Sequence, residues 1–118
     1  MKVLLAGDEE YRLYSEAIAN AIRTFRSHVE VALINMSELE AAVERLDPQL
    51  VIVSGAAIPK NPVGEKLMGY VELSPEPDRP SKFRVGERFW EFTNRTLDEI
   101  LSIVGEVEGL YGTSHEPE

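Results

Sequence analysis

Short apolar runs alternate with amphipathic stretches through the first half of the chain. Residues 2–6 (K-V-L-L-A) and 50–53 are continuously apolar, which is typical of strands buried on both faces. Residues 29–34 are rich in β-branched residues and predict another strand between them. Apolar residues recur at helical spacing from Tyr11, and a second such stretch begins near Leu39. The pattern predicts two β-α units followed by a third strand.

Each of the two predicted helices is expected to bury one stripe. The apolar positions of the first are Tyr14, Ala17, Ile18, Ala21, Ile22 and Phe25, and those of the second are Leu39, Ala42, Val43 and Leu46. Pro48 ends the second helix, and Ser37 with Glu40 fits a capping box at its start. The β-α units predict right-handed crossovers, a parallel sheet and helices on both faces.

The second half of the chain departs from this alternation. Residues 55–67 hold two prolines and two glycines without a sustained apolar stripe, so at most one or two helical turns are expected there. Residues 69–73 predict a strand, and three prolines make residues 74–80 a loop. Residues 82–92 are β-rich on both sides of Gly86 and predict a hairpin.

Aromatic residues concentrate in the predicted hairpin. Phe83 and Val85 are expected to face the core on one arm, with Trp90 and Phe92 doing so on the other. Alternation sends some aromatic side chains outward, which makes Phe89, Trp90 and Phe92 candidate contacts for a protein partner or for a second copy of the chain in a homodimer. The alternative is that these rings complete a small core left thin by missing helices. Both interpretations stay open at this stage.

A final helix is predicted near the end of the chain. Thr96 and Glu99 fit a second capping box, and Gly109 is expected to end the helix. Its expected apolar face comprises Leu97, Ile100, Leu101, Val104 and Val107. One domain is therefore expected over residues 1–109, followed by a flexible acidic tail over residues 110–118.

Composition narrows the function classes. The 118 residues include 12 Lys and Arg against 21 Asp and Glu, so the net charge of -9 opposes binding to nucleic acid or to an anionic membrane. The absence of cysteine excludes disulfides, thiolate nucleophiles and cysteine-based metal sites, and His28 and His115 are the only histidines. No apolar run is long enough for a membrane span or a signal peptide, which predicts a cytoplasmic protein.

Three segments carry a resemblance to a known family. Residues 2–10 (K-V-L-L-A-G-D-E-E), 47–54 (D-P-Q-L-V-I-V-S) and 97–101 (L-D-E-I-L) resemble parts of the receiver domain of two-component response regulators. The resemblance is clearest over residues 2–59 and again over 93–107. It implies an α/β fold, a flavodoxin/receiver-like three-layer α/β sandwich with a mostly parallel sheet in the order 2-1-3-4-5. In this chain a β-hairpin replaces helices in the second half and makes the last part of the sheet antiparallel.

The residues that carry receiver chemistry are largely replaced. That chemistry uses an aspartate nucleophile and a Mg²⁺ ion held by it and by a pair of acids. The first acid of the pair falls on Gly7 and the second on Asp8, with Glu9 following. The phosphoacceptor position falls on Ser54, which cannot form an acyl phosphate.

The remaining receiver positions fall on common residues. The hydroxyl that closes the fourth strand corresponds to Ser74, and the lysine that closes the fifth corresponds to Thr93. The resemblance therefore implies a pseudo-receiver, a non-catalytic signalling or regulatory module that binds an unknown protein partner. It implies no catalytic residue, cofactor or metal ion.

A small-ligand or nucleotide-binding domain is the alternative function. Its pocket would use the carboxyl ends of the first and third strands, around Asp8, Glu9, Ser54, Ser74 and Thr93. A simpler interpretation makes the acids an ordinary helix N-terminus and Ser54 the cap of a buried strand. Ser54 is disfavoured as a hydrolase nucleophile, because its general base would be His28, which precedes the second strand and is expected at the opposite edge of the sheet. A metal-assisted hydrolase built on Asp8 and Glu9 comes last, because the sequence shows no evident third anionic ligand.

Overall fold

The computed structural model describes residues 1–7, 12–26, 28–54, 67–73, 80–92 and 97–115. The strands in these residues are β1 (Lys2–Gly7), β2 (Glu30–Asn35), β3 (Leu50–Ser54), β4 (Gly69–Leu73), β5 (Ser81–Val85) and β6 (Arg88–Phe92). The α-helices are α1 (Arg12–Phe25), α2 (Leu39–Leu46) and α3 (Leu97–His115), and a 3-10 turn, η2 (Met36–Glu38), leads into α2. The predicted α/β class and the predicted strands are confirmed.

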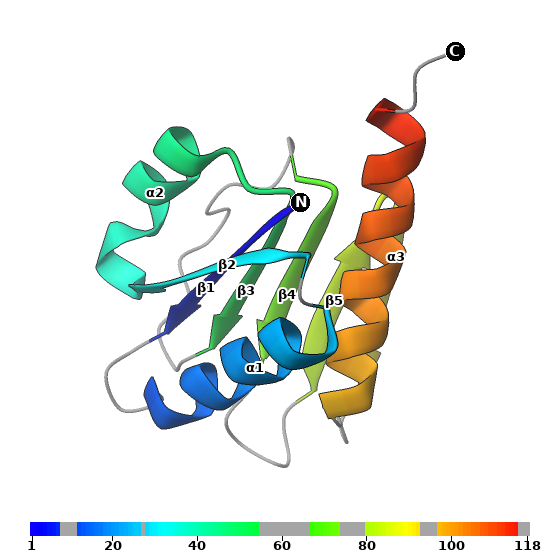
Figure 1. The fold of residues 1–118 in the computed structure, drawn as a ribbon. Helices are drawn as coiled ribbons and strands as arrows, with labels where there is room; N and C mark the ends of the chain where they lie inside the picture. The colour runs from blue at the N-terminus through cyan, green and yellow to red at the C-terminus, as the bar shows by residue number, and fades with distance from the viewer. Residues whose placement is uncertain (8–11, 27, 55–66, 74–79, 93–96, 116–118) are drawn as a thin grey trace.

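The strands form one mixed sheet in the order β2-β1-β3-β4-β5-β6 (Figure 1). The pairs β1–β2, β1–β3 and β3–β4 are parallel, whereas β4–β5 and β5–β6 are antiparallel. The expected order 2-1-3-4-5 holds for the first five strands, and the antiparallel end is as expected. A sixth strand, the second arm of the hairpin, extends the sheet beyond that order.

Helices cover both faces of the sheet (Figure 1). Under α1 and α3 lies the larger apolar cluster, which comprises Val3, Leu5, Ile18, Ala19, Ile22, Val29, Leu50, Ile52, Val71, Leu73, Phe83, Val85, Ile100, Ile103, Val104 and Val107. On the face of α2 lies the smaller one, which comprises Leu4, Ala6, Leu39, Ala42, Val51, Val53, Leu67 and Tyr70. Successive residues of β1 and β3 enter opposite clusters, which explains why these two strands are continuously apolar.

The buried stripe of α1 differs from the expected one. The residues that it buries are Ser15, Ile18, Ala19, Ala21 and Ile22. Phe25, which was expected to point inward, is 69% exposed, and Ala17 is exposed as well. The prediction followed apolar residues alone, but the stripe at spacing i, i+3, i+4 and i+7 begins on the small polar residue Ser15.

The start of α2 also differs from the prediction. Its N-cap is Glu38, and no side chain caps the helix there, so the expected capping box on Ser37 is wrong. The turn η2 occupies the place where that cap would form. At the other end, Asp47 adopts a left-handed conformation with φ 49°, and its N–H donates to the Val43 carbonyl at 3.0 Å. The helix therefore ends just before Pro48, as predicted.

The predicted hairpin is confirmed as β5 and β6. The register pairs Val85 with Arg88 and leaves Gly86 and Glu87 as a two-residue loop. Gly86 has φ +60°, the conformation that a type II′ turn requires at its first central residue. Phe83 and Val85 are buried as expected. The side chains of Trp90 and Phe92 lie outside the described residues, so their expected inward orientation stays a prediction.

The helix α3 extends to His115, past its expected end at Gly109. Gly109 lacks the positive φ with which a glycine ends a helix, so it continues the helical path. Close approach of α3 to the sheet depends on Gly69, where a Cβ would lie 2.6 Å from Val107 Cγ2. The expected capping box lies partly outside the described residues, at Thr96. No helix in the described ranges is long and apolar enough to cross a bilayer.

Candidate functional site

The carboxyl ends of β1 and β3 meet beside the first turns of α1. Gly7 ends β1 and is paired in register with Ser54, which ends β3. Ser15 reaches them from α1, and its Oγ lies 3.0 Å from Ser54 Oγ, so that one hydroxyl donates to the other. Both serines are buried, at 1% and 3% exposure. A hydrogen bond between two buried hydroxyls thus joins α1 to the carboxyl end of β3.

Gly7 leaves no room for a side chain at this point. A Cβ on Gly7 would lie 2.7 Å from Ser15 Oγ, 3.1 Å from Ser54 Oγ and 3.3 Å from the Ser54 carbonyl oxygen. Contacts this short force neighbouring atoms to move. Any side chain at Gly7, an acidic one included, would therefore displace the serine hydroxyls. We refer to Gly7, Ser15 and Ser54 as the serine cluster.

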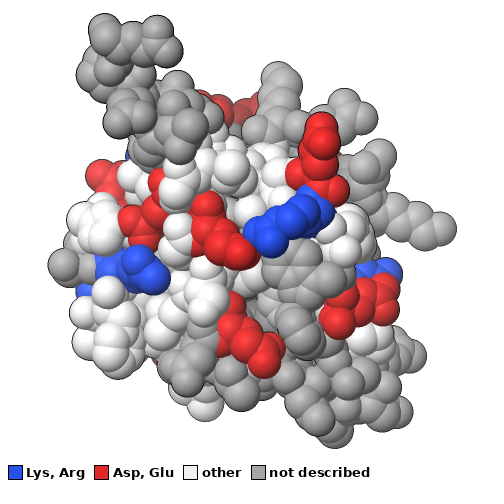
Figure 2. All heavy atoms as spheres, turned by 90° about the vertical axis from the view of Figure 1, so that its right-hand side faces the viewer, with Lys and Arg blue, Asp and Glu red and all other residues white. Residues whose placement is uncertain are grey.

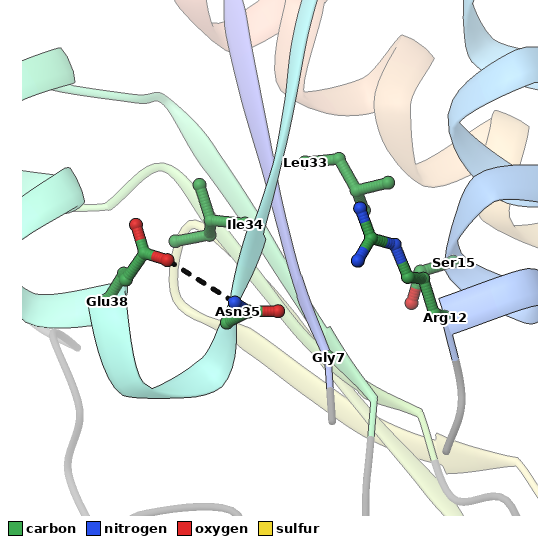
Figure 3. A pocket seen from close by; sticks show the side chains of 7 residues that line it. All are labelled: Gly7, Arg12, Ser15, Leu33, Ile34, Asn35 and Glu38. Carbon is green, nitrogen blue, oxygen red and sulfur yellow. Dashed lines mark hydrogen bonds between the residues drawn. The ribbon is translucent and has the colours of Figure 1, made fainter. Parts of the chain in front are cut away.

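A cavity of about 210 Å³ lies next to the serine cluster, at the carboxyl ends of β1 and β2 (Figure 3). It is lined by Gly7, Arg12, Ser15, Leu33, Ile34, Asn35 and Glu38. Arg12 and Ser15 come from α1, whereas Asn35 and Glu38 come from the end of β2 and from η2. The Arg12 guanidinium pairs with Glu16 at 3.4 Å, and Asn35 donates to Glu38 at 3.4 Å. The cavity therefore offers a cation, an anion and neutral polar groups.

Ser54 lacks the surroundings of a catalytic nucleophile. Its described hydrogen-bond partner is another hydroxyl, which is too weak a base to remove its proton. His28 lies just before β2, at the amino edge of the sheet, and its Nε2 pairs with a carboxylate oxygen of Glu108. The prediction that His28 and Ser54 lie at opposite edges is confirmed. The described ranges hold no group of three His, Cys, Asp or Glu side chains placed to bind a metal ion.

Of the predicted pocket residues, the structure describes Ser54. Asp8, Glu9, Ser74 and Thr93 lie outside the described residues. The sheet order nevertheless corrects one expectation. Thr93 was expected to close the fifth strand, but the strand that leads to it is β6, and β5 separates β6 from β4. Neighbouring strands are about 4.8 Å apart, so β6 ends one strand farther from Ser54 than the expected order implies.

Among the candidate partner contacts, Phe89 is exposed. Its relative exposure is 65%, and the register places it opposite Arg84 on the face of the sheet away from α3. Trp90 and Phe92 are described in their backbone alone, as members of β6. Exposure excludes Phe89 from the core, and its contact with a partner stays a prediction; for Trp90 and Phe92 both interpretations stay open.

Sequence reasoning missed Ser15 and the cavity residues Arg12, Asn35 and Glu38. A signal for Ser15 was present, since it completes the helical spacing that includes Ile18 and Ile22. A small polar residue on the buried stripe of a helix needs a hydrogen-bond partner, which points to a polar group at the sheet. The cavity residues had no comparable signal, because they are brought together by the pairing of β1 with β2.

A second buried polar group lies on the other face of the sheet. Burial raises the pKa of the Tyr70 phenol, and the neighbouring Glu72 carboxylate raises it further. The Tyr70 hydroxyl is buried without a hydrogen-bond partner among the described residues. Arg84, the cross-strand neighbour of Tyr70, donates from Nη2 to the Leu67 carbonyl at 3.2 Å. These residues join β4 to β5 and lie away from the serine cluster.

Comparisons with protein-family models, with curated proteins and with solved structures gave no significant match to this chain.

Proposed function

We propose that this chain is a receiver-like regulatory module that acts in the cytoplasm by binding a protein and is not switched by aspartyl phosphorylation. The proposal includes a flavodoxin/receiver-like arrangement for the β1–β4 part of the sheet. The order β2-β1-β3-β4, with parallel pairing and helices on both faces, supports it. The net charge of -9 favours a protein partner over a nucleic acid.

The serine cluster is the observation that carries the proposal. In a receiver, the ends of the first and third strands hold carboxylates that bind Mg²⁺ and accept the phosphoryl group. Here a glycine without room for a Cβ and a buried, hydrogen-bonded serine occupy those strand ends. Serine could accept a phosphoryl group only as a stable ester, and Ser54, a residue that is 3% exposed, is poorly placed to meet a donor.

Phosphoryl transfer can be tested directly with a small acyl-phosphate donor. The protein is incubated with Mg²⁺ and acetyl phosphate, and a phosphorylatable receiver domain is run in parallel. We expect intact-mass spectrometry to show no phosphoryl adduct on this chain and a labile adduct on the control. We also expect beryllofluoride with Mg²⁺ to leave the amide NMR spectrum unchanged. A labile phosphoryl adduct would overturn the proposal. So would a change in the NMR spectrum that requires beryllium, fluoride and Mg²⁺ together.

The cavity favours a second candidate function, the binding of a small polar ligand. Its lining combines Arg12 with Asn35 and Glu38, and its volume of about 210 Å³, below the roughly 300–1,000 Å³ of pockets for drug-sized molecules, restricts it to a smaller ligand. A thermal-shift screen with nucleotides, amino acids and divalent ions tests it, since a ligand that binds the folded state raises Tm. Stabilisation that is lost in Arg12→Ala and kept in Arg45→Ala, an exposed arginine on α2, would support this function. No stabilisation by any compound would contradict it.

A further inference from the structure

The two edges of the sheet differ in how their backbone groups are satisfied. At the β2 edge, the Glu30 N–H donates to the Met1 carbonyl, so the next residue, Val31, points its own backbone groups outward. The Val31 carbonyl is capped there by Arg23 Nη2 at 3.2 Å. Such a side chain blocks the approach of another strand. At the other edge, β6 pairs with β5 and with no other described strand.

The hairpin register determines which groups β6 presents at its edge. In a hairpin with a two-residue loop, the closing pair Val85–Arg88 is hydrogen-bonded, and such pairs alternate with non-hydrogen-bonded ones. Trp90 and Phe92 therefore bond to β5 through their backbones, whereas Phe89 and Glu91 direct their N–H and C=O groups outward. The Gly86 N–H, which donates to the Met68 carbonyl of the neighbouring segment at 2.8 Å, agrees with this alternation.

We propose that β6 pairs with β6 of a second copy of this chain, antiparallel and centred on Trp90, to form a homodimer with a continuous sheet. This register sets Phe89 opposite Glu91 of the second copy. Each such pair exchanges two backbone hydrogen bonds, and the two-fold axis creates two pairs. All outward N–H and C=O groups of Phe89 and Glu91 are then satisfied. The proposal uses the hairpin geometry alone and does not depend on the receiver-like function.

Charge selects this register over its neighbours. A pairing centred on Phe89 would set Glu91 opposite Glu87 of the second copy, and one centred on Glu91 would set two Glu91 side chains opposite each other. Like charges directly opposite across two strands are destabilising. In the register centred on Trp90, Glu91 lies between Lys82 of its own chain and Phe89 of the second copy. Phe89 in turn lies between Arg84 of its own chain and Glu91 of the second copy.

The hairpin is also a segment of this acidic chain that carries a small positive net charge. Residues 81–92 hold three basic and two acidic side chains, whereas the whole chain has a net charge of -9. Arg88 further pairs with Glu106 of α3 at 2.8 Å. On the side of the molecule that carries α3, Figure 2 shows basic side chains interspersed with acidic ones. Repulsion between the remaining acids is screened over about 8 Å at physiological salt.

Sedimentation velocity tests the proposed dimer. One short strand gives a small interface, so we expect dissociation in the micromolar range and measure from about 1 μM to about 1 mM. Phe89→Glu removes the exposed ring and sets a like charge opposite Glu91 of the second copy, and Glu91→Pro removes an outward N–H that β5 does not use. Phe25→Glu is the matched control, because Phe25 is 69% exposed on α1 against 65% for Phe89.

We expect wild type and Phe25→Glu to dimerise and both hairpin variants to stay monomeric, with circular dichroism showing that all of them fold. A wild type that is monomeric at ~1 mM would overturn the proposal, and so would a dimer that persists in folded Phe89→Glu and Glu91→Pro. The register has its own test, since the chain has no cysteine. Mixing Phe89→Cys with Glu91→Cys should give a rapid disulfide between the two variants, because directly paired Cα atoms are about 5.5 Å apart. A faster disulfide within either variant alone would contradict the register.

Discussion

The two halves of the sheet are built on different patterns of burial. In β3, all five residues are buried, whereas in β5 buried residues alternate with Lys82 and Arg84, which are at least partly exposed. The first pattern belongs to parallel strands with helices on both sides, and the second belongs to antiparallel strands with one solvated face. The change occurs at β4, which pairs parallel to β3 and antiparallel to β5. A parallel α/β sheet can therefore be completed by a hairpin without loss of its core.

The halves nevertheless share one hydrophobic core. The larger apolar cluster joins Val3 and Ile52 of the first half to Phe83 of β5 and Val104 of α3. Neither half could be removed without exposing the apolar surface of the other. The two halves thus differ in strand topology but share one core. Substitutions in each half test whether they unfold as one cooperative unit.

The largest effect is expected from Phe83→Ala in the second half. Phe83 is 1% exposed in the shared cluster, and truncation of such a ring costs about 3–5 kcal/mol. Chemical denaturation followed by circular dichroism and by tryptophan fluorescence should give one coincident transition, shifted to lower denaturant. Phe89→Ala, on the exposed side of the same hairpin, should change stability by less than about 0.5 kcal/mol at low protein concentration. Two separate transitions would show that the halves fold independently.

In the first half, Gly7→Ala should lower stability by about 1–3 kcal/mol, because its Cβ would meet Ser15 Oγ at 2.7 Å. The double variant with Ser15→Ala should recover part of the loss, since the obstructing oxygen is gone. Gly109→Ala is the control: nothing lies within 4 Å of its Cβ, and a helical alanine should stabilise α3 by up to about 1 kcal/mol. Equal effects of the two glycine substitutions would refute the steric account of the serine cluster.

The sequence predicted the strands of both halves for a physical reason. Apolar runs such as residues 50–53 mark strands buried on both faces, and a turn glycine such as Gly86 marks a hairpin. Both signals are local. The end of α3 was misplaced because a glycine ends a helix by its φ, which the sequence does not contain. Ser15 and the cavity were missed because their partners come from other strands and are determined by the register of pairing.

At the boundary between the halves, Tyr70 on β4 predicts a pH dependence. Burial raises the pKa of its phenol above the ordinary value of 10.0, so the folded state favours the neutral form. Below pH 10 both states are neutral at this group. Above pH 10 the unfolded chain releases the proton first, so the free energy of unfolding falls by up to about 1.4 kcal/mol per pH unit.

Tyr70→Phe should remove this part of the decline, and urea unfolding of both proteins at pH 9 and above would measure the difference. At neutral pH the same substitution should leave stability unchanged or raise it, because the buried hydroxyl has no described hydrogen-bond partner. Parallel pH curves for the two proteins would exclude a raised pKa at Tyr70.

The smallest effect is expected from the polar contacts that join the segment after α1 to α3. Glu108, 19% exposed, pairs with Arg26 at 3.4 Å and with His28, so Glu108→Gln should cost about 0.5–1 kcal/mol and less in high salt. Glu106→Gln is the comparison within the second half, because Glu106 is 42% exposed and pairs with Arg88 of β6. In thermal unfolding at low salt, Glu108→Gln should lower Tm more than Glu106→Gln does, and high salt should reduce both effects. The reverse order would mean that the contact between the halves adds no electrostatic stability.

The position of α3 has a consequence for synthesis of the chain. The first three strands are translated early, yet the face that they share with α1 is completed by Ile100, Ile103, Val104 and Val107. Until these residues leave the ribosome, a nascent chain carries apolar β-surface on this face that α1 alone does not cover. Such surfaces aggregate readily and are bound by chaperones. Burial of this face is therefore completed only when the last helix has been synthesised.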